Sequence, residues 1–461
     1  MLAGLNARSD DSSVRFEDFT IDPHWESYRS KLLPKNVPVI RQDFGLTTFQ
    51  GNPAIGGRVQ RSLISAWFAK VIPARTFSDK LSASGRFSVT NDDGGSGLLF
   101  GWFNDTSRGW RTPNSLVFRI DGNGGRYWIF YEYGTRHWLT GGGGCFEGDR
   151  YQTTKTRPFS ADGTAHTWSL NYDPQGNNRE GLITLLLDGK TYRQPLLPGH
   201  KEDGAEFNRF GIFNLQTTGG ALDAYFTDLV LDGAKVDLSN IEGWDAHGNK
   251  TQFEDRHLRP FHDFGWIPNN KAGRKPGELG GVIWRDEAPA YYANQVGPFS
   301  LEHELIASGT ISFNAAGSDS GAYLGWFDSR SKTNKISSDH EQPQKNFLAI
   351  LIEGPSRIGH YFRAHYQTAT GEGQMKDGGP VIRPDGIVHQ WSIHYLPQGA
   401  NGTGEIEIRL DDKIETLALK PEHRKQGANF DRFGLFNLQV GGHFVDIAVD
   451  DLSYTAGQKP K

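Results

Sequence analysis

The chain has 461 residues, a formal net charge of −5 and one cysteine, Cys145. A mildly acidic chain without a basic stripe argues against nucleic acid, the lack of an 18-residue apolar run argues against a membrane span, and one cysteine excludes an internal disulfide. Many glycines (57), many aromatic residues (12%) and few methionines (2) indicate an all-β protein.

The first residues, MLAGLNARSD, lack the charged start and the apolar stretch of a signal peptide. We therefore expect a cytoplasmic protein, or a secreted or periplasmic one if a leader has been removed. The oligomeric state stays open.

Two hairpins stand out along the first half of the chain. The segment SLVFRIDGNGGRYWIFYEYGT from Ser115 predicts two strands around a Gly/Asn tip, and ITLLLDGKTYRQ from Ile183 predicts two strands around an Asp-Gly turn. Apolar residues alternate at period two through most of the sequence, as in half-buried strands. This pattern predicts antiparallel two-sheet sandwiches.

The second half repeats the landmarks of the first half in the same order. HTWSLNYDPQG from His166 returns as HQWSIHYLPQG from His389, and FNRFGIFNLQ from Phe207 returns as FDRFGLFNLQ from Phe430. Both pairs are offset by 223 residues (389 − 166 and 430 − 207). Such a period is far too long for a solenoid. It predicts an internal duplication, with a first domain over 1–235 and a second over 236–461.

A Trp-led strand followed by a hairpin resembles the concanavalin A-like lectin/glucanase superfamily. The match rests on His166, Trp168, Asp188 and Gly189 in the first copy, and on His389, Trp391 and Asp411 in the second, where Asp412 replaces the glycine. The resemblance implies two tandem jelly-roll β-sandwiches and raises the expectation of a carbohydrate ligand. It does not select among glycoside hydrolases, polysaccharide lyases and binding modules.

Candidate catalytic carboxylates lie in the first copy. Glu132 sits in the otherwise apolar strand YWIFYEYGT, and a buried carboxylate needs either a partner or a task. The Gly-rich loop that follows adds Glu147 and Asp149. Glycoside hydrolysis uses two carboxyl groups, so our leading hypothesis is a glycoside hydrolase acting on a poly- or oligosaccharide from the concave face of the first sandwich. The alternative for Glu132 is a structural ion pair.

Candidate substrate-binding residues combine aromatic platforms with guanidinium and amide groups. Asn214 and Gln216 share one strand face, and the second copy repeats them; they either contact sugar hydroxyls or satisfy loop backbone groups. The candidates are Trp110, Arg111, Arg119, Trp128, His137, Trp138, Asn214, Gln216, Asn437 and Gln439.

The strand HYFRAHYQT in the second copy aligns with the strand of Glu132. It places Tyr361, Arg363 and His365 where the first copy has Trp128, Phe130 and Glu132. It is also similar to the Y-F-K-A-G-x-Y strand of jelly-roll alginate lyases, which implies a lyase that uses Tyr366, His365 and Arg363. A third hypothesis is a non-catalytic glycan-binding protein with two sites.

Acidic residues near the first and last strands of the first copy suggest a cation. Glu17, Asp18 and Asp228 offer oxygen ligands of the kind that Ca²⁺ prefers. We expect either a structural Ca²⁺ at this place or solvated turn carboxylates, and no cofactor for catalysis.

Overall fold

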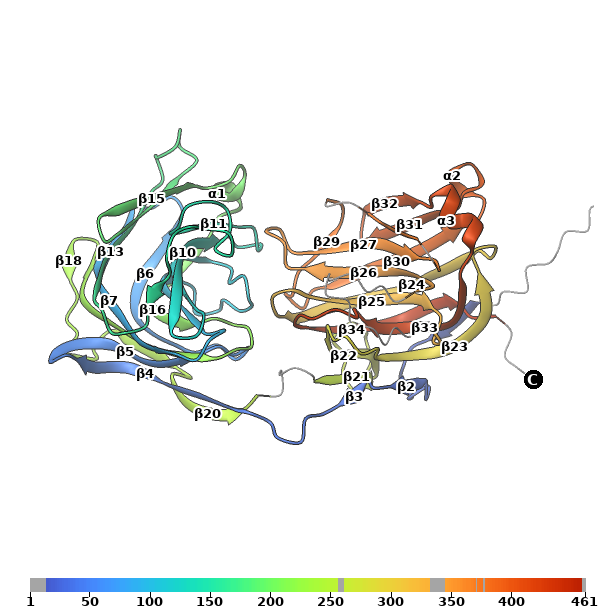
Figure 1. The fold of residues 1–461 in the computed structure, drawn as a ribbon, viewed down its shortest axis with the longest axis horizontal. Coiled ribbons are helices and arrows are strands. Elements are labelled where there is room, and N and C mark those ends of the chain that lie inside the picture. Colours follow the sequence, from blue (N-terminus) through green and yellow to red (C-terminus); the bar gives the residue numbers. More distant parts are fainter. Residues whose placement is uncertain (1–13, 256–260, 332–344, 370, 376–377, 458–461) are drawn as a thin grey trace, which may run out of the picture. The chain divides into compact units, whose positions relative to one another are not determined.

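The computed structural model describes residues 14–255, 261–331, 345–369, 371–375 and 378–457. It divides into two compact units: a continuous unit, Asn36–Leu258, and a discontinuous unit, Met1–Lys35 with Arg259–Lys461. Each unit consists of two layers of antiparallel strands (Figure 1). The predicted all-β architecture of two jelly-roll sandwiches is confirmed. In each unit we call the sheet with the Asn-Leu-Gln strand the front sheet and the other the back sheet.

In its described residues, 36–255, the continuous unit contains seventeen strands in two sheets and one short helix, α1 (His200–Asp203). In spatial order the front sheet is β11 (Thr140–Gly144), β10 (Arg126–Gly134), β9 (Ser115–Gly122), β8 (Gly97–Phe103), β16 (Glu206–Asn214), β6 (Trp67–Thr76) and β19 (Trp244–His247), with β12 (Phe159–Ser160) on β10. The back sheet is β15 (Lys190–Pro195), β14 (Leu182–Leu187), β13 (His166–Asp173), β7 (Leu81–Asp92), β17 (Ala221–Leu231), β5 (Asn52–Gln60), β4 (Val39–Phe49) and β20 (Lys250–Glu254), with β18 (Ala234–Lys235) on β17.

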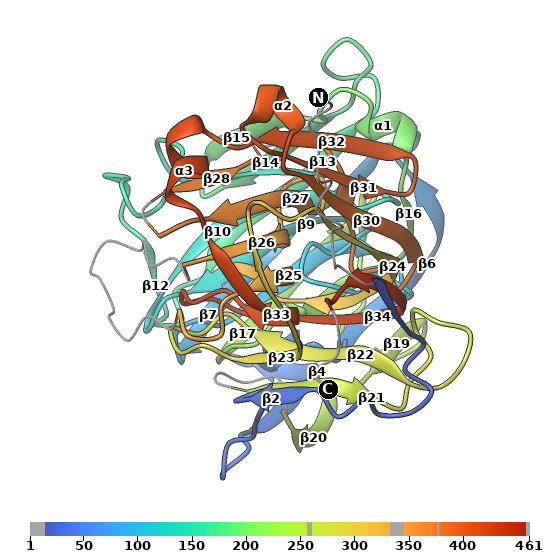
Figure 2. The ribbon, with the colours of Figure 1, turned by 90° about the vertical axis from the view of Figure 1, so that its right-hand side faces the viewer.

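The discontinuous unit has the same strand order, and Figure 2 shows its front sheet running from β27 through β26, β25, β33 and β23 to β2. That sheet is β28 (Glu372–Gln374), β27 (His360–Gln367), β26 (Phe347–Gly354), β25 (Ser320–Phe327), β33 (Asn429–Asn437), β23 (Tyr291–Ser300) and β2 (Glu26–Tyr28), with β29 (Val381–Ile382) on β27. The back sheet is β32 (Lys413–Ala418), β31 (Glu405–Leu410), β30 (Val388–Leu396), β24 (Leu305–Ala316), β34 (Phe444–Thr455), β22 (Glu278–Trp284), β21 (His262–Ile267) and β3 (Lys31–Leu32), with β1 (Val14–Glu17) on β34.

Two short helices, α2 (Gly399–Gly402) and α3 (Pro421–Gln426), complete this unit. Within the described part of the chain, none of the helices has the length and apolar character needed to span a membrane.

A separate aromatic core fills the space between the two sheets of each unit. In the continuous unit Phe100 of the front sheet stacks on Phe226 of the back sheet at 3.9 Å, and the ring of Trp168 lies edge-on to Phe100. Alternate residues of each strand contribute to this core, as the period-two pattern predicted. A second, smaller apolar cluster lies on the other face of each front sheet and includes Phe213 in one unit and Phe436 in the other.

The outermost strands of the two units do not follow the division of the chain that the repeat predicted. The N-terminal strands β2 and β3 pair with β23 and β21, while β19 and β20 pair with β6 and β4. The structural units therefore differ from the division 1–235 and 236–461 that the repeat led us to expect. The chain passes between the units near residue 35 and again near residue 258.

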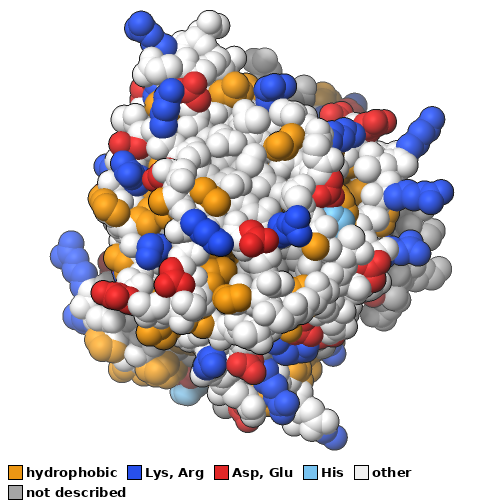
Figure 3. Space-filling view, turned by 90° about the vertical axis from the view of Figure 1, so that its left-hand side faces the viewer, with side chains coloured by type: hydrophobic (Ala, Val, Ile, Leu, Met, Phe, Trp, Pro, Cys, Tyr) orange, Lys and Arg blue, Asp and Glu red, His pale blue; other side chains and the backbone are white. Residues whose placement is uncertain are grey.

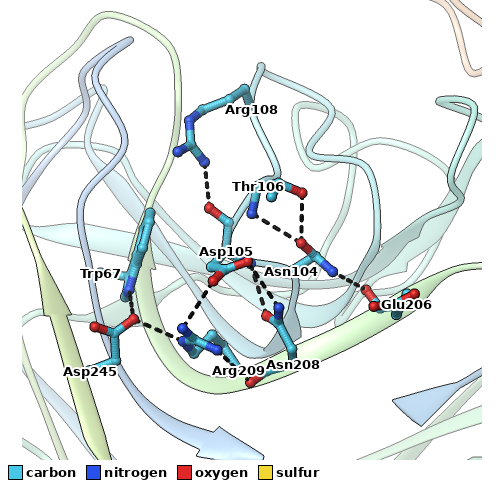
Figure 4. Close-up of polar contacts among 9 residues, drawn as sticks. All are labelled: Trp67, Asn104, Asp105, Thr106, Arg108, Glu206, Asn208, Arg209 and Asp245. Atoms are coloured by element: carbon cyan, nitrogen blue, oxygen red, sulfur yellow. Dashed lines mark hydrogen bonds and ion pairs between the residues drawn. The ribbon is translucent and has the colours of Figure 1, made fainter. Parts of the chain in front are cut away.

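The exchanged strands are held by equivalent polar clamps. In the continuous unit Arg209 donates to Asp105 and to Asp245 of β19, both at 2.9 Å, and the indole of Trp67 also donates to Asp245 (Figure 4). In the discontinuous unit Arg432 pairs with Glu26 of β2 at 2.6 Å. In each unit a partly buried arginine that pairs with two carboxylates therefore holds the exchanged strand in place.

The substitution Arg209→Ala tests this clamp. It leaves Asp105 and Asp245 without their shared cation, and hydrogen bonds to charged groups are worth about 1.5–3 kcal/mol each. We expect the free energy of unfolding of the continuous unit to fall by about 2–3 kcal/mol in urea titrations. Arg75→Ala is the control, because Arg75 is 37% exposed and 3.5 Å from Asp232; it should cost under about 1 kcal/mol. Equal losses for the two variants would contradict the clamp.

A buried histidine makes the discontinuous unit sensitive to acid. His262 is fully buried and its Nδ1 accepts from the backbone N–H of Trp284. Burial lowers the pKa of His262 to about 4. Because the folded pKa lies below the unfolded one, this stability is present above pH 6.5 and is lost as the pH falls towards 4.

The other unit supplies a matched replacement for His262. Gln42 occupies the equivalent position and accepts from the N–H of Gln60 in the same way. We expect His262→Gln to reduce the loss of unfolding free energy between pH 6.5 and 4 by up to about 3 kcal/mol, at roughly 1.4 kcal/mol per pKa unit. Denaturant titrations of both proteins at several pH values measure this difference. Burial also raises the pKa of Asp450 to about 6, but Asp450 is present in both proteins and does not contribute to their difference. Identical pH profiles would therefore contradict the role of His262.

Candidate functional site

The outer face of each front sheet carries the charged residues that the sequence analysis selected. In the continuous unit Glu132 of β10 lies 3.6 Å from the guanidinium of Arg119 on β9. Arg119 also lies 3.6 Å from Asp121, and Asp121 pairs with Arg61. The carboxylate of Glu132 therefore belongs to a chain of alternating charges, which is the ion pair that we held as the alternative to catalysis.

Aromatic rings surround this ion-pair chain. The guanidinium of Arg119 lies over the rings of Phe130, at 4.5 Å, and Trp110, at 5.5 Å. Trp128 is buried and contacts Phe146 and Tyr151 from the Gly-rich loop. Three of the predicted binding residues, Trp110, Arg119 and Trp128, are thus on the same sheet face as Glu132.

Other residues of the prediction lie elsewhere. Glu147 is exposed and its carboxylate is 3.8 Å from Lys190 at the start of β15 in the back sheet. Asp149 is exposed in the same loop. His137 is bound to Asp203 at 2.7 Å, next to the partly buried Trp138. Arg111 is partly buried beside Trp110. Glu147 thus pairs with Lys190 of the back sheet, while Glu132 pairs with Arg119 of the front sheet.

The four consecutive glycines have a packing role. Residues 140–144 form strand β11 against β10. A Cβ atom on Gly141 would meet the ring of Tyr133 at 2.4 Å, and one on Gly142 would meet the carbonyl oxygen of Tyr131 at 2.4 Å. Only glycine lets β11 approach β10 this closely. Strand packing therefore explains the four consecutive glycines, and a mobile flap is not needed to explain them.

The repeated Asn-Leu-Gln strand fixes loops within each unit. Asn214 accepts from the N–H of Ala66 and donates to the carbonyls of Ser62 and Ile64. Asn437 does the same for residues 286–290. Gln216 accepts from the N–H of Gly109 and so positions the loop that carries Trp110. These amides are occupied by backbone groups, so we no longer assign Asn214, Gln216 and Asn437 to ligand contact; Gln439 is likewise buried.

The discontinuous unit has a different set of groups at the same sheet position. His365 of β27 is buried, and its Nδ1 is 3.1 Å from the hydroxyl of Tyr323 on β25. Its Nε2 lies 3.8 Å from the half-exposed carboxylate of Glu372 on β28, and His365 lowers the pKa of Glu372. Burial raises the pKa of Tyr323, so its hydroxyl is protonated at neutral pH. The three side chains form a Tyr–His–Glu relay.

Arg363 lies beside this relay on the same strand face. It pairs with Glu353 of β26, and its guanidinium lies 4.9 Å from the ring of Tyr361. With the amide of Gln374 turned so that its oxygen faces the guanidinium, Arg363 donates to it at 2.7 and 2.8 Å. The relay therefore has a cation and an amide next to it.

Tyr366 does not join this group. Its hydroxyl bonds to Nδ1 of His423 at 3.0 Å and accepts from the N–H of Lys420, inside the core. Successive residues of a strand point to opposite faces, so Tyr366 and His365 diverge. Placing Tyr366 in a lyase site was therefore wrong, and Tyr323 occupies the place that we had given to it.

The proposed cation ligands belong to different units. Glu17 ends β1 of the discontinuous unit and Asp18 follows it, while Asp228 lies in β17 of the continuous unit, 3.9 Å from Arg86. The exchange of the N-terminal strands separates them. Within the described residues there is no group of three or more His, Cys, Asp or Glu side chains arranged to hold a metal.

Tyr323, Glu353, Glu372 and Gln374 were not among the predicted site residues. Strand parity alone could not place Tyr323, which aligns with Leu99 of the first copy. Tyr323 faces Leu351, and Leu351 faces Arg363, so only the register of neighbouring strands shows that Tyr323 and Arg363 share a sheet face. The arginine also lies on a different strand of this pair in the two units. In the continuous unit Arg119 of β9 faces Phe130 of β10, and in the discontinuous unit Arg363 of β27 faces Leu351 of β26.

Comparisons with known proteins give only distant matches. No family model matches the chain, and no curated protein matches it. Among solved structures it is similar to mouse laminin alpha1 chain domains LG4-5 (10% identity, TM-score 0.25, 90% of this chain and 93% of that chain). It is also similar to peanut lectin (12%, 0.25, 43% and 92%) and to alginate lyase vAL-1 from Chlorella virus (13%, 0.26, 43% and 92%). At these values neither ligands nor activities transfer to this chain.

Proposed function

We propose that the protein acts on carbohydrate and that its discontinuous unit cleaves a uronate-containing glycan by β-elimination. The observation that carries the proposal is the Tyr323–His365 hydrogen bond of 3.1 Å on the sheet face that also carries Arg363. An acid, a base and a cation for a carboxylate are the groups that this reaction needs.

Each group has a role in the elimination. Arg363, with Gln374, binds the uronate carboxylate and so acidifies the adjacent C5–H. When the Tyr323 hydroxyl turns from His365 to O4, Nδ1 of His365 is free to take the C5 proton as general base; the C4–O4 bond breaks, and a C4=C5 double bond forms. The protonated hydroxyl of Tyr323 gives its proton to the departing O4 oxygen. Glu372 orients His365 and stabilises the imidazolium.

A panel of polysaccharides tests the proposal. We expect the purified protein to release reducing ends together with the ultraviolet absorbance of the double bond from at least one polyuronate, such as alginate, pectate or hyaluronan. Neutral glucans and xylans should give neither signal, because they lack the carboxylate that Arg363 binds. Cleavage of neutral glycans alone, without ultraviolet absorbance, would contradict elimination.

Hydrolysis in the continuous unit is the second candidate function. Glu132 occupies the sheet position of His365, beside the aromatic rings of Trp110 and Trp128. Glycoside hydrolysis needs two carboxyls about 5–9.5 Å apart. Asp121 of β9 lies 3.6 Å from the same guanidinium as Glu132, that of Arg119. The second carboxyl would therefore be either Asp121 or a residue of the loop that carries Glu147 and Asp149.

The same panel separates these functions. New reducing ends without ultraviolet absorbance, lost in Glu132→Gln, would assign hydrolysis to the continuous unit. Retained affinity for a glycan without either signal would leave the third candidate, a binding protein. Elimination in the discontinuous unit predicts both signals, and predicts that Glu132→Gln leaves them unchanged.

A further inference from the structure

The outer face of the back sheet in the continuous unit contains an open polar hollow of about 320 Å³. It lies over β20, β4, β5 and β17, on the face opposite to the core, because Asp43 and Tyr225 alternate with the buried Phe44 and Phe226. It is therefore separate from the front-sheet residues considered above. Figure 3 views this side of the unit, where basic and acidic side chains are interspersed.

The hollow has a charge ladder on one side. Across the four strands, Lys250 faces Asp43, Asp43 faces Arg58, and Arg58 faces Asp223. The signs alternate along the ladder, and Arg58 also donates to Asp93 at 2.7 Å, so three carboxylates accompany two basic groups. Such a row offers donors and acceptors in turn and carries a small excess of negative charge.

The floor next to the ladder is made of backbone. Gly45 faces Gly56, and Gly56 faces Tyr225. A Cβ atom on Gly56 would meet the carbonyl oxygen of Ala224 at 2.1 Å, and Gly56 has φ +156°. Gly56 therefore permits the close approach of β5 and β17, and neither glycine places a side chain over the strands. The ring of Tyr225, stacked on Phe49 at 4.4 Å, forms an apolar wall.

At the equivalent place the discontinuous unit keeps Lys31, Asp263 and Asp446 but lacks the guanidinium and the aromatic ring. Val282 stands in the position of Arg58 and Ala448 in that of Tyr225. The ten-residue connection 268–277 folds onto this face, where Lys271 pairs with Asp446 at 3.1 Å and Glu278 accepts from the N–H groups of Ala272 and Gly273. The discontinuous unit thus covers this place with its connection 268–277, while the continuous unit leaves it open and lines it with Tyr225 and Arg58.

We propose that the hollow of the continuous unit binds a neutral pyranose residue. Sugar hydroxyls donate to Asp43 and Asp223 and accept from Arg58 and Lys250, while the apolar edge of the ring packs on Tyr225. The volume lies at the lower end of the range for ligand pockets, which suits one sugar unit. The site goes beyond the elimination proposed above and shares no residue with it.

Titration of the intact protein with neutral monosaccharides (glucose, galactose, mannose, xylose and N-acetylglucosamine), followed by NMR, tests this site. We expect at least one sugar to bind in the millimolar range. Tyr225→Ala and Arg58→Val, which introduce the residues of the other unit, should each weaken it by about tenfold or more. Arg86→Ala, a substitution on the same sheet outside the hollow, should not change the affinity.

Two results would overturn the proposal. The first is that none of these sugars binds the wild-type protein, and the second is that binding survives both Tyr225→Ala and Arg58→Val. Melting temperatures identify a variant that fails through unfolding, and Arg58→Val, at the surface, keeps the test decisive if Tyr225→Ala is unstable. The activity of the discontinuous unit is measured separately on polyuronates, so failure of one proposal is distinguishable from failure of the other.

Discussion

Trp25→Ala should loosen the discontinuous unit, although Trp25 lies in the stretch 1–235 that the repeat predicted as the first domain. The indole is buried and packs against Phe19 and Tyr292, beside the strand β2 that closes the front sheet. Truncation of a buried Trp costs about 3–5 kcal/mol. That loss is a large part of the 5–15 kcal/mol that stabilises a typical domain.

Hydrogen exchange read by mass spectrometry locates the effect. Trp25→Ala should raise exchange in residues 291–300 and 429–437 and leave 36–255 unchanged. Trp244→Ala is the matched variant, because Trp244 stacks on Phe68 at 5.0 Å in the continuous unit; it should raise exchange around 67–76 instead. Faster hydrogen exchange in the continuous unit of Trp25→Ala would contradict the assignment of Trp25 and β2 to the discontinuous unit.

Tyr323→Phe and His365→Ala should each reduce elimination by about 10²-fold or more, because each removes a group that moves a proton in the transition state. Tyr323→Phe keeps the ring between Phe347 and Phe436 and removes only the hydroxyl. Its melting temperature should therefore stay close to that of the wild-type protein. Turnover per folded molecule on a polyuronate measures the effect.

Two control variants sharpen this result. Glu132→Gln keeps the shape of the side chain in the continuous unit and should leave elimination unchanged. Tyr366→Phe removes the hydroxyl that bonds to His423 in the core, so it should lower the melting temperature and leave turnover per folded molecule intact. Loss of turnover in Glu132→Gln, with full activity in His365→Ala, would move the site to the continuous unit.

Much of the fold was predictable because its signals are local. Alternating apolar residues gave the strands, and the Asp-Gly turn after Leu187 gave the hairpin of β14 and β15, which the structure contains. The repeat gave two units of similar strand order. The exchange of β2 and β19 was not predictable, because each segment has the same pattern whether it pairs with its own copy or with the other.

The candidate site was predictable only in part, for the same reason. Parity along one strand placed Arg363 and His365 on one face, as the structure does. Tyr323, Glu353 and Gln374 reach that face from three other strands, and only the register between strands shows it. Asn214 and Asn437 are repeated because each binds the backbone of a loop. The matching strand order and these matching loop contacts are what an internal duplication predicts.

The mass of the products formed from a polyuronate tests the central claim most directly. Elimination forms a C4=C5 double bond at the new non-reducing end, so each such oligosaccharide is lighter by one water molecule than its hydrolytic counterpart. We expect the wild-type protein to release these unsaturated products, and Tyr323→Phe to release almost none. Saturated products, or an intact polymer across the whole polyuronate panel, would contradict a lyase centred on Tyr323, His365 and Arg363.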